Sequence, residues 1–420
     1  MSNKLGDYIE FKNGLNYDKT HKGNGCKIVG VANFKNNLHI NFENLDEVKS
    51  DIVSDDMLLK NDDLLFVRSN GNKSLVGRCL FVSDLQEKMS FSGFTIRARI
   101  KNKQKLLPKY FLYYATAPNF KNSLYKKIGG GTNIRNLTQA VLEDINIELP
   151  ELDNQKKIAN CLDQITQKIQ LNNKINDELE KLAKTLYEYW FVQFDFPDEN
   201  NRPYKSSGGK MVYDEKYNKI IPIGWKIQNL NKNDLTQIIQ PSIDKFENEK
   251  IYLPTANIQD DKIVDFSNKI TFENRESRAN MQPKSNSVWF AKMKNSKKIL
   301  YFADYSNEYL DNLILSTGLC GLHCKDSTLE FIWNTINSEY FEIKKDSLAH
   351  GATQQAVNND DLVSIPLLIP PSDIILKFHN KTKSLYYQKY INELEVQKLI
   401  ELREFLLPML MNGQISVVAE

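Results

Sequence analysis

The chain has 420 residues, of which 41% are hydrophobic, 10% aromatic and 26% charged. This balance excludes a disordered chain, and the length predicts two or three domains. Lys and Arg number 55 against 53 Asp and Glu, so the net charge of +2 excludes a protein that is basic throughout but permits a local basic surface. Five cysteines in so long a chain predict reduced thiols and a cytoplasmic location. No apolar run is long enough to cross a bilayer, so we expect no membrane partner.

The first part of the chain predicts short strands and a helix. Runs of β-branched and aromatic residues predict strands over residues 28–31, 64–67, 95–100 and 145–149. Residues 108–115 predict a helix with an aromatic face.

A long helix is predicted after Pro150. Apolar residues recur there at steps of three and four from Ile158 to Leu186, which is typical of a coiled-coil seam. The pattern returns from Ser372 to Leu407, where we expect Pro408 to break the helix and Gly413 to supply a stop. Since the chain must return, the two helices are expected to pack antiparallel.

The second half of the chain repeats the first. With a shift of 220 residues, residues 142–150 align with 362–370, and both segments end an alternating apolar pattern with proline. With a shift of 224 residues, Phe66 aligns with Phe290. Matches that keep one order along the chain predict a duplicated protein.

The predicted fold class is α+β, with two similar globular domains separated by two long antiparallel coiled-coil helices and related by an internal pseudo-two-fold repeat. The predicted boundaries are 1–150 for the first domain, 151–196 for the first long helix, 197–224 for a linker, 225–370 for the second domain, 371–413 for the second long helix and 414–420 for a tail.

Basic residues are concentrated in two stretches. Residues 88–142 contain eleven Lys or Arg and no Asp or Glu, and residues 277–303 contain six and again no acid. One such stretch in each half is typical of a polyanion ligand that is bound twice, so we predict nucleic-acid binding. The alternative is that each stretch is only a solvated charged face.

Polar loops in or beside these stretches supply the candidate DNA-binding residues. Glycine lets backbone amides approach phosphate, whereas Arg, Asn and Gln can bind base edges through two hydrogen bonds. The candidates in the first half are Arg68, Ser69, Asn70, Asn72, Lys73, Lys126, Lys127, Thr132, Asn133, Arg135 and Asn136. Those in the second half are Lys292, Lys294, Asn295, Lys297, Lys298, Thr353, Gln354, Gln355 and Asn358. The alternative is that these loops are polar surface turns.

No catalytic or metal site is predicted. The chain has neither the glycine-rich ATP loop nor the motifs of methyl transfer from S-adenosylmethionine. A nuclease-like arrangement of Asp198 and Asp214 falls in the predicted linker. We interpret Cys320 and Cys324 as buried thiols rather than zinc ligands. A free-standing enzyme is therefore disfavoured, and the main alternative is a non-catalytic coiled-coil scaffold that does not bind DNA.

Several segments resemble the specificity subunits of type I restriction–modification systems. They are residues 181–197, 202–212, 221–225 and 402–414, together with the strand–proline–helix junctions at Pro150 and Pro370. The second junction departs from the first, because it lacks a counterpart of Gln155.

The resemblance implies two target-recognition domains in inverted orientation, each of which reads one half of a split double-stranded DNA target. It implies that the long helices dock two methyltransferase subunits and that restriction subunits join this core. It also implies a non-catalytic subunit that holds no cofactor, so S-adenosylmethionine, ATP and Mg²⁺ are expected on the partner subunits.

Overall fold

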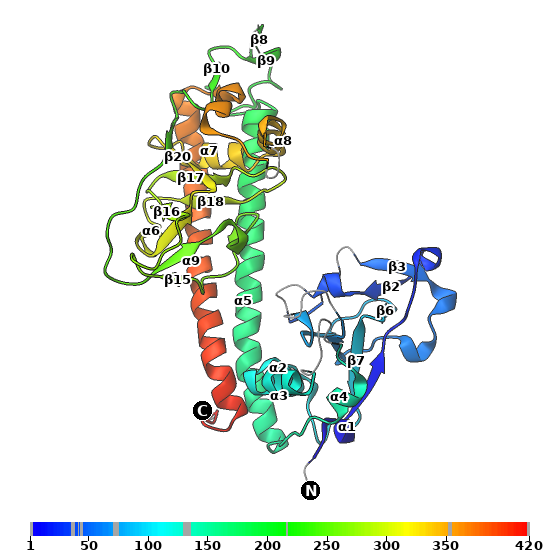
Figure 1. Cartoon of the computed structure of the whole chain (residues 1–420). Helices are drawn as coiled ribbons and strands as arrows, with labels where there is room; N and C mark the ends of the chain where they lie inside the picture. Colours follow the sequence, from blue (N-terminus) through cyan, green and yellow to red (C-terminus); the bar gives the residue numbers. More distant parts are fainter. Residues whose placement is uncertain are drawn as a thin grey trace. The chain divides into compact units, whose positions relative to one another are not determined.

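The computed structural model describes residues 3–34, 38–40, 42, 45–69, 75–128, 136–215, 217–351 and 355–417. It divides into two compact units (Figure 1). Unit 1 comprises Met1–Leu171 and Glu395–Glu420, and unit 2 comprises Asn172–Leu394. Two long helices each contribute residues to both units. Among the described residues, no helix combines the length and the apolarity needed to span a membrane.

Unit 1 is built on two small sheets. The four-stranded antiparallel sheet has the order β1 (Ile9–Asn13), β7 (Thr95–Ile100), β4 (Leu64–Val67), β5 (Cys79–Phe81). The three-stranded sheet has the order β3 (Asp46–Lys49), β2 (Gly25–Val29), β6 (Met89–Phe91), in which β2 and β6 run parallel. The helical segments are α1 (Leu5–Tyr8), α2 (Pro108–Thr116), α3 (Pro118–Ile128), α4 (Gln139–Glu143) and the 3₁₀ turns η1 (Lys19–His21), η2 (Val31–Asn33), η3 (Ser50–Ile52) and η4 (Asp55–Met57).

Unit 2 is built on two sheets that correspond to those of unit 1, and the second of them has one strand more. One has the order β11 (Thr236–Ile239), β20 (Leu319–Cys324), β17 (Ser287–Ala291), β18 (Ile299–Phe302). The other has the order β15 (Lys269–Ile270), β12 (Lys250–Leu253), β19 (Leu313–Ser316), β16 (Ala279–Met281), in which β12 and β19 run parallel. Three pairs complete it: β8 (Met211–Asp214) with β9 (Lys219–Pro222), β10 (Lys226–Asn229) with β21 (Pro366–Ile369), and β13 (Ile258–Gln259) with β14 (Lys262–Ile263). Its helical segments are α6 (Asn307–Asn312), α7 (Leu329–Ile336), α8 (Glu339–Leu348), η7 (Thr255–Asn257) and η8 (Asn359–Ser364).

The central strand of each unit separates two hydrophobic cores, because successive side chains of a strand point to opposite faces. In β4, Leu64 and Phe66 join one core, and Leu65 and Val67 join the other. In β17 of unit 2, Trp289 likewise faces away from the core that holds its two neighbours. Strand order, antiparallel pairing and the parallel pair therefore follow the same plan in both units.

The long helices are α5 (Leu152–Tyr187), which continues in a π-helical turn over Glu188–Val192, and α9 (Ser372–Met411). In unit 2, the side chain of Asn392 donates a hydrogen bond to Asn176 at 2.8 Å. The Tyr187 and Phe378 rings also lie 6.4 Å apart there. Residue numbers rise along one helix as they fall along the other, so the two helices run antiparallel within this unit.

The end of α9 differs from the prediction. Pro408 does not break the helix, which continues to Met411. Proline removes one backbone hydrogen bond, which is a small loss in a last turn that ends three residues later. The predicted stop at Gly413 is confirmed, because its φ of 67° turns the chain out of the helix and the N–H of Gln414 donates to the Met409 carbonyl at 2.9 Å.

The strand predicted over residues 145–149 does not form. Only a bridge between Asn146 and Lys4 is present, flanked by a hydrogen bond from the Leu5 N–H to the Ile145 carbonyl at 2.9 Å. The facing segment enters α1 at Leu5, so it offers too short a partner for a ladder. Its counterpart in unit 2, β21, pairs fully with β10.

The predicted linker, residues 197–224, carries the β8–β9 hairpin. Its first part is attached to an aromatic cluster of unit 2. The Tyr204 ring stacks on Phe196 at 4.6 Å, and Phe196 stacks on Trp225 at 5.0 Å. Stacked rings of this kind add to the stabilisation that comes from their burial.

Candidate nucleic-acid interface

In unit 2, the two predicted loop regions lie side by side. Lys292 follows β17, and its carbonyl accepts a hydrogen bond from the Val357 N–H at 3.0 Å. The N–H of Lys294 donates to the Gln355 carbonyl at 2.9 Å. The N–H of Lys292 also donates to the carbonyl of Gly318, in the turn before β20, at 3.0 Å. Lys292, Gly318 and Val357 thus form a junction of three chain segments, which we call the unit 2 junction.

Unit 1 contains the same arrangement. The N–H of Arg68 donates to the Phe94 carbonyl at 2.8 Å, and its carbonyl accepts from the Leu137 N–H at 2.9 Å. Arg68, Phe94 and Leu137 form the unit 1 junction. Shifts of 224, 224 and 220 residues convert these positions into those of the unit 2 junction. Each junction therefore joins the end of a central strand, the turn before a neighbouring strand, and the loop before α4 in unit 1 or η8 in unit 2.

The sequence prediction missed the turn that forms the third segment of each junction. A signal for it was present, because the 224-residue shift that aligns Phe66 with Phe290 also aligns Phe94 with Gly318. The candidates Asn70, Asn72, Lys73, Thr132, Asn133, Arg135, Thr353 and Gln354 lie outside the described residues.

Some of the described candidate side chains of unit 1 make contacts within the protein, and others are exposed to solvent. The Arg68 guanidinium donates to the Gly93 carbonyl at 3.2 Å, and Arg68 and Ser69 are half-buried. Asn136 and Lys126 are exposed. Lys127 forms an ion pair with Asp144, whose pKa the hydrogen bonds from Lys127 and Lys4 lower to about 2. Lys126 and Lys127 therefore differ in their surroundings, because only Lys127 is held in an ion pair.

In unit 2, several candidates support the loops themselves. Lys297 donates to the Asn337 carbonyl at 3.0 Å, and Lys298 donates to a carbonyl of η7. Asn295 adopts a φ of 53°, and its N–H donates to Asp346 at 3.0 Å. The side chain of Asn358 contacts His350 at 3.1 Å. Of the described candidates in unit 2, Lys294 and Gln355 are exposed, and neither side chain has a partner among the described residues.

Five of the eleven cations in the basic stretch of unit 1 form ion pairs in the fold. These five pair with carboxylates that precede or follow the stretch in sequence. The pairs are Arg97–Glu10 at 2.8 Å, Arg99–Asp63 at 2.7 Å, Lys103–Asp62 at 2.5 Å, Lys109–Asp163 at 2.7 Å, and Lys127–Asp144. Arg97 is fully buried, and burial lowers its pKa. The absence of acids from this stretch of sequence therefore does not create a uniform positive surface.

The basic stretch of unit 2 is different. Within the described part of the chain, no carboxylate pairs with any of its six cations, which are Arg278, Lys284, Lys292, Lys294, Lys297 and Lys298. An uncompensated cation attracts phosphate over a longer range than a paired one. The positive charge of unit 2 is thus more available to a polyanion.

The thiols that could suggest a metal lie inside a strand. Cys320 and Cys324 are buried in β20, and burial raises the pKa of Cys320 to about 12 and that of Cys324 as well. Both thiols are therefore protonated at neutral pH and lie within the core. In the described part of the chain, no group of three His, Cys, Asp or Glu side chains could hold a metal ion.

Unit 2 also encloses a cluster of charges beside the long helices. The Lys389 ammonium lies 2.8 Å from Glu180 and forms a second ion pair with Asp261. Burial opposes the charge of Lys389, but the surrounding carboxylates outweigh it and raise its pKa. Burial also raises the pKa of Glu393 to about 7. The cluster joins both helices to the β13–β14 turn, so its role is structural.

Three exposed apolar side chains lie along α5 and its π-helical continuation in unit 2. Ile175, Leu182 and Tyr189 are 38%, 56% and 37% exposed and recur every seven residues. This spacing places them on one face of a helix, away from the buried Asn176 and Ala183. We call the three residues the α5 stripe.

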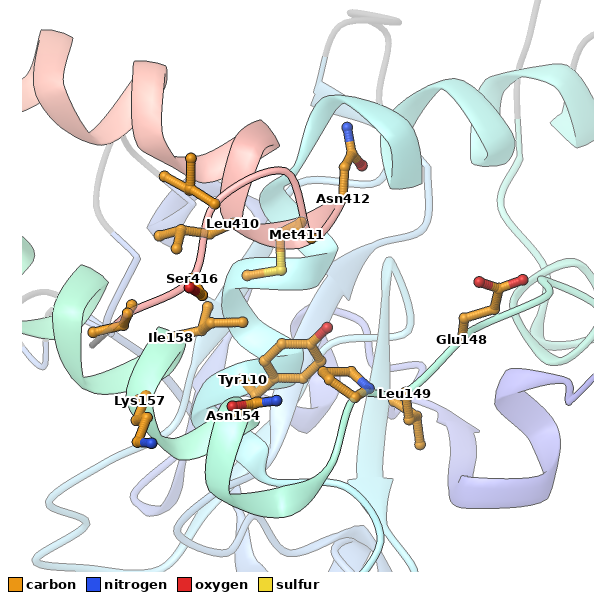
Figure 2. Close-up of a pocket in the computed structure, with 14 residues that line it drawn as sticks. Tyr110, Glu148, Leu149, Asn154, Lys157, Ile158, Leu410, Met411, Asn412 and Ser416 are labelled. Carbon is orange, nitrogen blue, oxygen red and sulfur yellow. The ribbon is translucent and has the colours of Figure 1, made fainter. Parts of the chain in front are cut away.

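Unit 1 contains a cavity of about 410 Å³ where the start of α5 meets α2 and the end of α9 (Figure 2). Tyr110, Ile158 and Leu410 line it, and Glu148 and Lys157 lie at its edge.

The chain is similar to a known class of protein. Residues 1–181 match the type I restriction modification DNA specificity domain. The MjaIX type I restriction enzyme specificity subunit of Methanocaldococcus jannaschii is 25% identical over 318 residues, which cover 73% of this chain and 69% of that one. The HindI specificity subunit of Haemophilus influenzae is 23% identical over 399 residues, which cover 81% and 84%.

The fold agrees with this class. The S subunit of a type I restriction–modification system from M. genitalium has a TM-score of 0.54 to this structure at 11% identity, over 98% of this chain and 95% of that one. The chain is thus similar over most of its length to the family of type I restriction–modification DNA specificity subunits, and residues 1–181 match the specificity domain. Subunits of this family are non-catalytic, in agreement with the missing catalytic motifs.

Proposed function

We propose that the chain is the sequence-specific DNA-recognition subunit of a type I restriction–modification complex and that it reads a bipartite target with one unit for each half-site. The observation that carries the proposal is the recurrence of the junction. Arg68 and Lys292 occupy equivalent positions and make equivalent backbone hydrogen bonds in the two units. A DNA-specificity family together with two equivalent polar junctions supports two reading sites rather than one.

The described side chains at the junctions suit two kinds of DNA contact. Asn136 in unit 1 and Gln355 in unit 2 are exposed amides beside their junctions, and amides can bind the edge of adenine through two hydrogen bonds. Lys126 and Lys294 are exposed cations without carboxylate partners among the described residues, which suits them to phosphate. Phosphate contacts would position each unit, and the amides would read bases.

We further propose that two methyltransferase subunits dock on the long helices and that restriction subunits join through them. The α5 stripe supports this, because a row of exposed apolar side chains bordered by polar ones marks a protein–protein interface. S-adenosylmethionine, ATP and Mg²⁺ would then belong to the partners, and this chain would hold none of them. The methyl transfer itself would take place on the partner subunits.

The proposal is tested by expressing the chain with its methyltransferase subunit and sequencing the methylated genome. We expect methylation at a target of two short half-sites that are separated by an unread gap. Asn136→Ala should relax one position of one half-site and Gln355→Ala one position of the other, each by about 1–3 kcal/mol of discrimination. Each variant is the control for the other.

Three results would reject the proposal. They are an uninterrupted target, relaxation of the same half-site by both variants, and a purified chain that shows no salt-dependent binding to duplex DNA. The last result would favour the alternative of a scaffold that does not bind DNA.

A further inference from the structure

Phe94 is an aromatic side chain that the fold leaves in solvent. It is 63% exposed, and no other large hydrophobic residue is exposed among the described residues before Leu152. It lies in the turn between β6 and β7, and its carbonyl forms part of the unit 1 junction. The most exposed apolar ring of this region therefore lies beside Arg68, at the site where DNA contact is proposed.

The turn that carries Phe94 is held in one conformation. The N–H of Phe94 donates to the Ser92 hydroxyl at 3.3 Å, and the Thr95 N–H donates to the Ser92 carbonyl at 2.8 Å. The Gly93 N–H donates to the Leu15 carbonyl at 2.7 Å. A Cβ at Gly93 would lie 2.0 Å from the Asn16 side-chain oxygen, so a larger residue there would require Asn16 to move. Phe94 is thus presented by a fixed backbone rather than by a loose loop.

The fold does not need an aromatic residue at this position. In unit 2 the equivalent residue is Gly318, whose carbonyl accepts the equivalent hydrogen bond from Lys292 at 3.0 Å. A Cβ at Gly318 would meet its nearest neighbours at 3.4 Å, an ordinary contact. The same turn therefore forms with and without a side chain here. Packing does not explain the Phe94 ring, and its exposure to water costs free energy in the isolated chain.

We propose that Phe94 is a specificity-determining residue that contacts the 5-methyl group of a thymine in the half-site read by unit 1. Thymine presents the apolar group of the major groove, and a phenyl ring is one of the side chains that contacts it. Arg68, one backbone hydrogen bond away, supplies the polar contacts that flank such a methyl group. Because Gly318 has no side chain, the half-site of unit 2 lacks this contact. The inference rests on the proposed function.

The test uses the full chain in complex with its methyltransferase subunit. Each thymine of the target is replaced in turn by deoxyuridine, which lacks only the methyl group, and binding is measured at fixed salt. The wild-type complex should bind about four-fold more weakly when one particular thymine of the unit 1 half-site is replaced, the effect of one buried methyl group. The Phe94→Ala complex should bind the thymine and deoxyuridine duplexes equally at that position.

Two controls accompany the test. Deoxyuridine in the half-site of unit 2 should leave the ratio of wild-type to Phe94→Ala affinity unchanged. Tyr213→Ala removes a ring on β8 that is 55% exposed, and it should keep the four-fold discrimination at the unit 1 half-site.

The proposal is overturned if no thymine of the unit 1 half-site discriminates in the wild-type complex, or if Phe94→Ala retains the discrimination. A uniform loss of affinity in Phe94→Ala without any response to deoxyuridine would indicate a ring inserted between base steps, and it would also overturn the thymine contact. Sequence-specific methylation by the wild type would still stand in these cases. Its absence would instead reject the proposed function.

Discussion

Replacing Phe191 by alanine should destabilise unit 2 strongly. Phe191 lies in the π-helical turn that follows α5 and is 3% exposed. Its ring centroid lies 4.7 Å from Phe331, 5.0 Å from Phe378 and 6.0 Å from Trp225. The substitution removes the Phe191 ring, which contacts all three of these side chains, and leaves a cavity among rigid rings. The expected loss in free energy of unfolding is about 3–5 kcal/mol.

Tryptophan fluorescence can measure this loss in unit 2 alone. The chain has four tryptophans, and all of them, Trp190, Trp225, Trp289 and Trp333, belong to unit 2. In urea the free energy of unfolding of a small protein falls by about 1–3 kcal/mol per molar. The midpoint of the fluorescence transition should therefore fall by at least about 1 M. Ile343→Ala, at a side chain that is 60% exposed, is the control and should change the stability by less than about 0.5 kcal/mol.

A midpoint shift below about 0.3 M, at unchanged dependence on urea, would refute the reasoning, since it corresponds to less than about 1 kcal/mol. It would show that the surrounding rings close over the space. A changed dependence on urea would show instead that the unfolding is no longer a single transition of unit 2.

Three further predictions follow from the charges and the exposed surfaces. The folded-state pKa of Glu393 lies near 7, above its value in an unfolded chain, so unit 2 should lose stability as the pH rises from about 4.5 to about 7. Glu393→Gln should remove about 3 kcal/mol of this decrease in urea titrations at several pH values, and an unaltered decrease would assign it to another group. Leu182→Asp in the α5 stripe should reduce co-purification with the methyltransferase subunit at least about ten-fold. Lys181→Asp, on another face of the helix, is the control and should leave co-purification unchanged. Equal losses in the two variants would argue against the stripe as the docking surface. Lys294→Ala should weaken binding to all DNA sequences and lower the salt slope by about 0.9, with Lys181→Ala as the control, and a loss confined to the specific target would make Lys294 a base-reading residue.

The sequence predicted those strands and helices whose own residues show a regular pattern of apolar and polar side chains. The strands at Leu64–Val67 and Thr95–Ile100 are confirmed, because continuous apolar or alternating runs are visible without knowledge of the fold. The two long helices were visible in the same way, from apolar residues at steps of three and four. The strand expected at 145–149 failed because a strand needs a partner, and the helix α1 shortens the segment that faces it.

The candidate site was less predictable, because charge compensation depends on distant residues. Arg99 pairs with Asp63, and Lys109 pairs with Asp163 on α5. Neither acid lies within the basic stretch, so the sequence suggested a positive surface where the fold forms ion pairs. The sequence did not predict the exposure of Phe94 either. An aromatic residue between two strands is more often buried, and only the fold shows that this ring lies in solvent.

The unequal pairing of the two basic stretches has a consequence for how the protein would search a genome. Unpaired lysines near the unit 2 junction attract any phosphate backbone, and this attraction permits sliding along non-specific DNA. In unit 1, five cations of the basic stretch pair with carboxylates of the same unit, so this unit would draw a larger share of its affinity from the correct bases. We therefore expect unit 2 to hold the chain on DNA during the search and unit 1 to discriminate between target and non-target sequences. Raising the salt concentration should then slow target location before it lowers sequence specificity.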